Sequence, residues 1–140
     1  MKLQVAIDRV SLAHAITLAK DLDGIADVIE LGTSLVKDYG LIALSDIKAE
    51  IKQSELLMDL KAIDEGVYEF NKGFEVNADI LTVMGSADLS TISAVYDVTE
   101  KAGKTMLIDL LNMTDEEIAP LMTFEHAIFG LHHSHDNASN

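Results

Sequence analysis

The stretch that decides the fold is Glu55-Leu56-Leu57-Met58-Asp59-Leu60-Lys61-Ala62-Ile63-Asp64. If residues 55–61 form a strand, Asp59 and Lys61 are two positions apart and share one face of it. Two carboxylates and an ammonium at the end of an apolar run can hold a hard cation and stabilise an oxyanion. The pattern is short, so its meaning depends on what ends the other apolar runs of the chain.

Short apolar runs alternate with longer helical patterns along the chain. Strands are predicted at Leu3–Ile7, Val28–Leu31, Leu56–Leu60, Ile80–Met84, Met106–Leu110 and Ala127–Leu131. Helices are predicted at Leu12–Leu22, Leu41–Lys52, Val67–Val76, Leu89–Ala102 and, more weakly, Asp115–Met122. The strand centres follow one another every 22 to 29 residues, which indicates a repeated strand–helix unit. The sequence therefore predicts one α/β domain over residues 1–140, with a parallel sheet covered by helices.

Capping residues support these helices. Ser11 is predicted to cap the first helix, and Thr114 to begin the fifth with a capping box. Gly103 is predicted to end the fourth helix. Gly40 is interpreted as a loop residue, and Pro120 indicates that the fifth helix is short or bent.

The charge of the chain narrows its possible partners. Twenty-four acids against 10 bases give a net charge of −14, which argues against nucleic acid and anionic membranes. Arg9 is the only guanidinium, so a phosphorylated substrate would depend on backbone amides at helix N-termini. There is no cysteine, no long apolar run and no signal peptide at Met1, so we expect a cytoplasmic protein.

Polar groups also stand at the ends of the other predicted strands. In a parallel barrel these carboxyl ends meet on one rim, where the active site lies. Like charges on that rim would raise one another's pKa values unless a divalent cation and the lysine compensate them. Carboxylate oxygens suit Mg²⁺, which needs one or two of them plus water and substrate oxygens. The rim residues expected from the strand ends are Asp8, Glu30, Asp59, Lys61, Asp109 and His132.

Each of these rim residues could have a purely structural role instead of a functional one. An aspartate after a strand is usually a turn or capping residue, and Asp109 and Asp88 are interpreted in this way. Glu30 differs because it lies inside the apolar run Val28–Leu31, where an acid needs a partner. The histidines of residues 132–136 could bind a transition metal adventitiously or provide one proton-transfer group.

Several segments, in order along the chain, carry a family resemblance. They are Leu3–Asp8, Asp27–Thr33, Met58–Asp64 and Asn77–Gly85, with weaker matches at Gly103-Lys104 and Gly130–His132. On these segments the chain resembles the 3-hexulose-6-phosphate synthase and 3-keto-L-gulonate-6-phosphate decarboxylase group of the orotidine 5′-phosphate decarboxylase superfamily. Residues 83–88 and 108–113 are closer to the synthase than to the decarboxylase.

The resemblance implies a (β/α)₈ TIM barrel that forms a homodimer with active sites at the interface and uses Mg²⁺. It implies an aldehyde-lyase that adds formaldehyde to ribulose 5-phosphate, a phosphorylated ketose, through a metal-bound enediolate. The alternatives are decarboxylation of 3-keto-L-gulonate 6-phosphate or a non-catalytic remnant of the family. By position, the resemblance implies that Glu30 and Asp59 bind both Mg²⁺ and the substrate, and that Asp8 contacts the substrate. It implies that Lys61 stabilises the enediolate and that His132 transfers a proton. It also implies that Asp64 reaches the active site of the partner subunit.

The chain departs from the family in two places. After His132 it reads His133-Ser134-His135-Asp136-Asn137, where the synthases have Thr-Gly, an acid and glutamines; Asp136 fits that substrate-binding acid. Six strands and the five helices between them use 131 residues, whereas a closed barrel needs at least ~200. We therefore expect a member shortened after strand six, without the phosphate-binding loops that follow strands seven and eight. The alternative is an intact chain that compensates by association with a partner. A doubly wound fold is disfavoured because residues 8–11 contain no glycine-rich loop.

Overall fold

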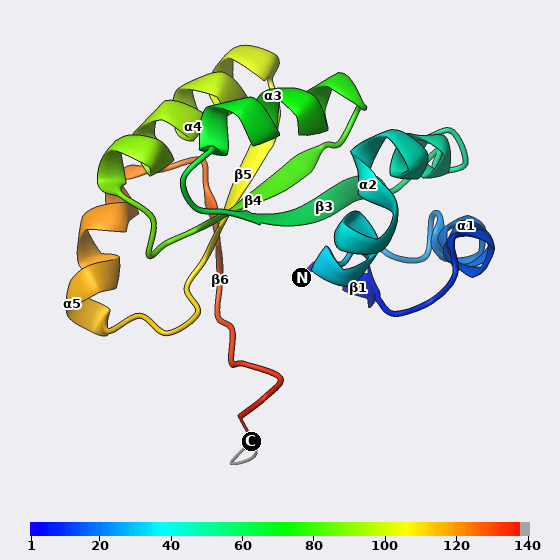
Figure 1. Cartoon of the computed structure of the whole chain (residues 1–140), viewed down its shortest axis with the longest axis horizontal. Coiled ribbons are helices and arrows are strands. Elements are labelled where there is room, and N and C mark those ends of the chain that lie inside the picture. The colour runs from blue at the N-terminus through cyan, green and yellow to red at the C-terminus, as the bar shows by residue number, and fades with distance from the viewer. Residues whose placement is uncertain (138–140) are drawn as a thin grey trace.

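Six parallel strands follow one another around a curled sheet, and the helices cover its outer side (Figure 1). The computed structural model describes residues 1–137. The strands are β1 (Gln4–Ile7), β2 (Val28–Leu31), β3 (Glu55–Ala62), β4 (Ile80–Met84), β5 (Thr105–Asp109) and β6 (Ile128–Gly130), and they pair in that order. This is the incomplete, TIM-barrel-type α/β fold that the sequence predicts, open between β1 and β6.

Four of the helices lie close to their predicted positions. They are α1 (Leu12–Leu22), α3 (Gly66–Glu75), α4 (Leu89–Ala102) and the short α5 (Asp115–Ile118), which continues as the 3₁₀ helix η1 (Ala119–Thr123). The Ser11 side chain accepts a hydrogen bond from the N–H of His14 at 3.1 Å, and Gly103 ends α4 in the left-handed conformation. Thr114 forms the predicted capping box, and Pro120 lies at the change from α5 to η1. The predicted caps and the short fifth helix are therefore confirmed.

The prediction for the second helix was wrong at both ends. Helix α2 (Thr33–Lys48) begins directly after Gly32 and ends before Lys52. Gly40, with φ 79° and ψ 161°, interrupts the helical backbone. Two shorter helical runs therefore meet at this glycine. Neither run is long enough for its apolar residues to show a clear helical period in the sequence.

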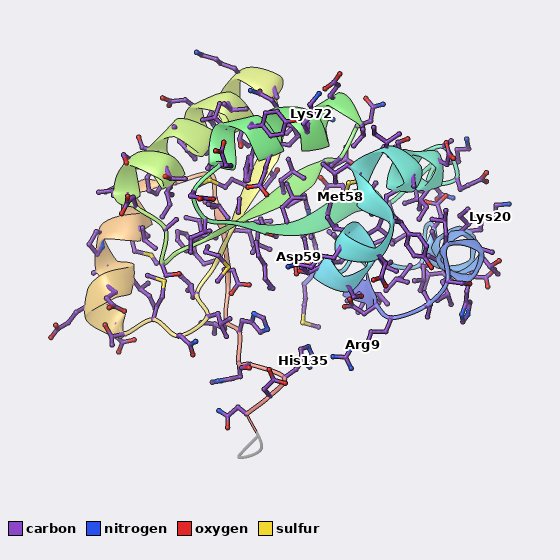
Figure 2. All side chains as sticks on the ribbon, in the orientation of Figure 1. Arg9, Lys20, Met58, Asp59, Lys72 and His135 are labelled. Carbon is purple, nitrogen blue, oxygen red and sulfur yellow. The ribbon has the colours of Figure 1, made fainter. Side chains whose placement is uncertain are left out.

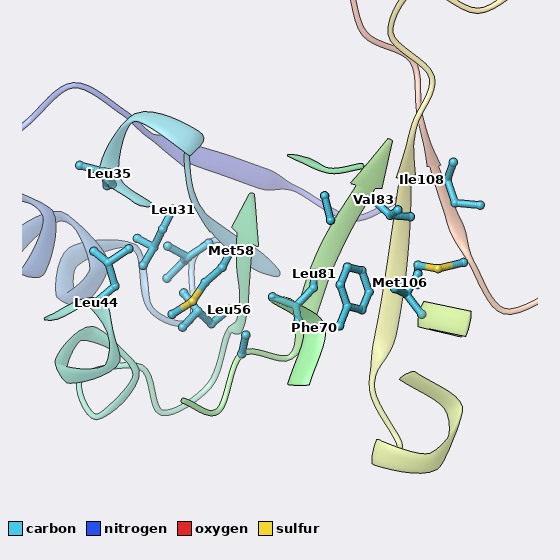
Figure 3. Packing of buried hydrophobic residues seen from close by; sticks show 14 of the residues in the cluster. Leu31, Leu35, Leu44, Leu56, Met58, Phe70, Leu81, Val83, Met106 and Ile108 are labelled. Carbon is cyan, nitrogen blue, oxygen red and sulfur yellow. The ribbon is translucent and has the colours of Figure 1, made fainter. Parts of the chain in front are cut away.

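The two faces of the sheet pack differently, because side chains alternate along each strand. The outer face packs against the helices in the main hydrophobic core (Figure 3), through Ile29, Leu31, Leu56, Met58, Leu81, Val83, Met106 and Ile108. The inner, concave face carries only a small apolar cluster of Val28, Leu57 and Ile80, with Leu107 packed against it. Each fully buried side chain of this kind stabilises the fold by roughly 1.5–3 kcal/mol. The larger outer core holds the sheet, which leaves the concave face available for polar groups.

The helices of residues 1–137 are all too short or too polar to traverse a lipid bilayer.

Candidate active site

A cavity of about 540 Å³ opens on the concave face at the carboxyl ends of the strands. Five of the side chains predicted to form a site line it together: Asp8, Glu30, Asp59, Lys61 and His132. They come from four separate strands or the residues that follow them, as expected for the rim of a barrel. Figure 2 shows Asp59 at the centre of the curled sheet.

Lys61 lines this cavity at the point where the pairing of β3 becomes irregular. The pairing of β3 with β4 shifts between Met58 and Ala62, and Lys61 has a left-handed φ of 47°. Its N–H donates to the Thr82 hydroxyl at 2.9 Å, and that hydroxyl donates to Asp59 Oδ1 at 2.7 Å. The predicted contact between Asp59 and Lys61 is confirmed, with Nζ to Oδ2 at 3.2 Å. The side chains alternate as predicted, because Asp59 and Lys61 line the cavity whereas Met58 and Ala62 pack in the outer core.

Asp109 belongs to the same cluster, so its interpretation as a turn residue was wrong in the main point. One of its oxygens does accept the N–H of Leu111 at 2.9 Å, as a turn residue would. The Lys61 ammonium, however, lies 2.8 Å from Asp109 Oδ2, and His132 Nδ1 lies 3.0 and 3.2 Å from the two carboxylate oxygens. The alternation of side chains along β5 could have identified Asp109 as a site residue, because Asp109 and Leu107 share the concave face.

The charges of this cluster reinforce one another. Burial disfavours the ammonium of Lys61, but the hydrogen bond to Asp109 and the charges of Asp59 and Asp109 outweigh it, so its pKa is raised. Burial likewise opposes the charge of Asp109, but Lys61, the Leu111 N–H and His132 lower its pKa below the ordinary value. Lys61 is therefore a fixed positive charge at neutral pH, held between two carboxylates.

Glu30 carries the opposite perturbation. Burial is the main cause of its raised pKa, and the nearby charges of Asp59 and Asp8 add to it. The amide of Gln4 donates to Glu30 Oε1 at 2.7 Å and offsets part of the effect. The expected repulsion between rim acids is confirmed at this residue.

The residues present fit a Mg²⁺ ion. Within residues 1–137 no three or more His, Asp or Glu side chains are arranged around a metal-sized point, which also applies to the histidines of residues 132–136. Mg²⁺ needs only one or two carboxylates, with water for the rest. Glu30 and Asp59 line one cavity from adjacent strands and repel each other, so a divalent cation between them would relieve the raised pKa of Glu30.

Asp8 is held at the rim by α2. The Ser34 hydroxyl donates to Asp8 Oδ1 and accepts the N–H of Arg9 at 3.0 Å. The carboxylate lies directly over Gly32, where a Cβ atom would be 2.0 Å from Oδ1. Gly32 therefore provides the space that Asp8 occupies.

Asp64 and Asp136 do not join the other site residues. Asp64 lies at the start of α3, in a smaller pocket of about 220 Å³ with Tyr68 and Thr91. Asp136 is exposed and does not line the cavity, and its N–H donates to the Ser134 hydroxyl at 3.1 Å. The roles predicted for these two acids stay predictions.

Known proteins share both this sequence and this fold. The 3-hexulose-6-phosphate synthase of Bacillus subtilis is 41% identical over 117 residues, and the chain spans 56% of its length. A crystal structure of a 3-hexulose-6-phosphate synthase superposes with a TM-score of 0.92 at 32% identity, over 100% of this chain and 69% of that one. A 3-keto-L-gulonate-6-phosphate decarboxylase from Vibrio cholerae superposes with a TM-score of 0.81 at 28% identity, over 88% of this chain and 58% of that one.

The match extends to the level of the whole family. The sequence model of the orotidine 5′-phosphate decarboxylase / HUMPS family covers residues 1–139. The chain belongs to that family.

Proposed function

We propose that this chain carries the charge-stabilising and proton-transfer part of a Mg²⁺-dependent aldehyde-lyase site, which joins formaldehyde to ribulose 5-phosphate. The observation that carries the proposal is the contact series Asp59–Lys61–Asp109–His132 in one cavity. Two features support the choice of reaction: the relatives named 3-hexulose-6-phosphate synthase, and the higher structural similarity to a synthase than to a decarboxylase.

Lys61 would stabilise the negative charge that develops on the substrate. Its raised pKa keeps it protonated, and two carboxylates fix its ammonium at 2.8 and 3.2 Å before the substrate arrives. A charge fixed in advance needs little reorganisation when an enediolate forms. Glu30 and Asp59 would hold the Mg²⁺ ion, which when bound supplies further positive charge to the substrate's vicinal oxygens.

His132 would move the proton. Asp109 occupies its Nδ1 atom, which leaves Nε2 for the substrate. In the aldol direction Nε2 takes a proton from C1 of the ketose, and the electron pair of that C–H bond enters the enediolate. C1 then bonds to the formaldehyde carbon, and the formaldehyde oxygen receives a proton from the imidazolium. The Asp109 carboxylate stabilises the imidazolium between these two steps.

Decarboxylation is the second candidate, because the decarboxylase structure shares 28% identity and the same half-barrel. In that reaction the enediolate forms by loss of CO₂, and the imidazolium then protonates it. Lys61 and His132 would serve both reactions in the same positions.

Turnover by the 140-residue chain tests the proposal. With Mg²⁺ and ribulose 5-phosphate, we expect formaldehyde consumption that falls at least 100-fold in Lys61→Met and in His132→Gln. His126→Gln is the matched control, since His126 is exposed and pairs with Glu100 instead of lining the cavity. CO₂ release from 3-keto-L-gulonate 6-phosphate without formaldehyde consumption would establish the decarboxylase instead. A folded chain that binds Mg²⁺ but turns over neither substrate would indicate a non-catalytic remnant of the family.

We also propose that the chain forms a homodimer. Exposed apolar side chains lie close to Asp64 in the sequence, namely Ile63, Val67 and Tyr68, and the last two line the same small pocket as Asp64. A second copy seated there would bring Asp64 toward the partner's cavity. Sedimentation equilibrium should show a dimer that Tyr68→Glu dissociates, and a monomer at all concentrations would contradict it.

A further inference from the structure

Arg9 lies at the mouth of the cavity and has no role in the chemistry described so far. It is the only arginine of the chain and directly follows the site acid Asp8. Its N–H is fixed by the Ser34 hydroxyl at 3.0 Å, its φ is 54°, and its side chain lines the cavity. The loop after β1 therefore presents a guanidinium to the concave face.

Within residues 1–137, this guanidinium lines the cavity without an ion pair, unlike the ammonium of Lys61. Lys61 is shared between Asp59 and Asp109, and His132 is also bound by Asp109. Among residues 1–137 no carboxylate forms an ion pair with Arg9. In a chain of net charge −14, an arginine without an acidic partner beside a cavity is available to an anion.

His135 faces the same opening from the other end of the sheet. Its ring packs edge-on against His132, with ring centroids 6.3 Å apart and an interplanar angle of 72°. It lines the cavity together with Arg9, although β1 and β6 are the outermost strands of the sheet. Figure 2 shows the two labelled side chains extending toward the same opening. The curl of the sheet thus brings an arginine and an imidazole from distant parts of the sequence together at the mouth.

We propose that Arg9 and His135 form an anion site that takes the phosphate group of a phosphorylated substrate. The guanidinium can donate two parallel hydrogen bonds to phosphate oxygens, and the imidazole can donate a third. The carbonyl end of such a substrate would then reach Lys61 and His132 deeper in the cavity. Assigning the anion to a substrate rests on the proposed function, whereas the anion site itself rests on the geometry of this chain. It would hold phosphate without the loops of strands seven and eight.

Titration of the 140-residue chain with inorganic phosphate at constant ionic strength tests the site. We expect amide shifts at Arg9, Ser34 and residues 132–135, and a dissociation constant that rises about tenfold in Arg9→Gln and less in His135→Gln. Lys20→Gln is the matched control: it removes the same charge from α1, where Lys20 pairs with Glu50 at 3.5 Å outside the cavity. Circular dichroism of each variant verifies that the fold is kept. Undetectable phosphate binding, or equal affinity in Arg9→Gln, would overturn the site.

Substrate kinetics separate the two proposals. If the chain consumes formaldehyde, the KM for ribulose 5-phosphate should rise about tenfold in Arg9→Gln and stay unchanged in Lys20→Gln. Turnover with an unchanged KM in Arg9→Gln would overturn the anion site and leave the lyase proposal standing. Phosphate binding that depends on Arg9 in a chain without turnover would support the anion site and contradict the lyase.

Discussion

Glu30 is a site residue whose charge lowers the stability of the folded state. It is a carboxylate in an otherwise apolar strand, near two other acids, with one amide donor at 2.7 Å. Its pKa is raised mainly by burial, which means that its charged form destabilises the folded state. Such a residue is expected where function rather than stability sets the choice of side chain.

Glu30→Gln should therefore stabilise the protein at neutral pH. A group with a raised folded-state pKa favours folding below its unfolded pKa of about 4.3, and that contribution is lost as pH rises. The glutamine keeps an oxygen for Gln4 and never ionises. Urea unfolding should show a gain of about 1 kcal/mol at pH 7 that disappears near pH 4. The exposed Glu125→Gln should change stability by less than about 0.5 kcal/mol at both pH values. A loss of stability in Glu30→Gln at pH 7 would contradict this explanation.

Lys61→Met should destabilise the protein at neutral pH, the opposite sign to Glu30→Gln. The substitution leaves Asp59 and Asp109 without their ammonium, at an expected cost of about 2 kcal/mol at pH 7. Because the folded-state pKa of Asp109 is lowered, its stabilising charge is present above about pH 4 and is lost on further acidification. The difference in the free energy of unfolding between Lys61→Met and wild type should therefore become smaller below about pH 4. Lys20→Met, which breaks an exposed pair, should cost less than about 0.5 kcal/mol, and an equal cost for both variants would refute the buried network.

At the level of single elements, β3 shows which features the sequence pattern could predict and which it could not. The apolar run and the D-x-K spacing predicted the strand and the contact between Asp59 and Lys61. They could not predict the bulge, where the N–H of Lys61 donates to the buried hydroxyl of Thr82 in the neighbouring strand. The part of helix α2 before Gly40 was missed for a different reason, since residues 33–39 are too few to show a helical period.

Thr82→Val should reveal how much the bulge depends on that hydroxyl. The valine has the same shape but leaves the N–H of Lys61 and one oxygen of Asp59 without a partner. We expect a loss of 1–3 kcal/mol in urea unfolding, and altered chemical shifts at Lys61. Thr99→Val is the matched control, because Thr99 is equally buried but its hydroxyl donates only to the carbonyl of Val95 within α4. Similar losses for both would mean that the bulge does not need Thr82.

At the level of the whole molecule, the constant strand–helix period predicted the parallel, curled sheet. The same reasoning brought five of the site residues to one rim. Asp109 was placed on the rim but interpreted as a turn residue, because only its three-dimensional contacts with Lys61 and His132 distinguish the two roles. Arg9 was counted only as the single guanidinium, because its position opposite His135 depends on the curl of the sheet.

The open sheet should be least stable at its ends. Strands β1 and β6 pair on one side only, and Leu3, Ile128 and Leu131 are exposed beside them, whereas β3 and β4 are paired on both sides. Native-state hydrogen exchange should therefore protect the amides of β3 and β4 most and those of β6 least. Equal protection across all six strands would show that something else covers the edges, such as a second chain.

The most direct test of the central claim is the exchange of solvent deuterium into C1 of ribulose 5-phosphate, followed by NMR with Mg²⁺ and no formaldehyde. The claim is that Lys61, Asp109 and His132 form one unit that generates an enediolate. It predicts stereospecific label uptake by the 140-residue chain, reduced at least 100-fold in Lys61→Met and His132→Gln and unchanged in His126→Gln. Label uptake that persists in Lys61→Met, or none above the protein-free rate in folded wild type, would contradict it.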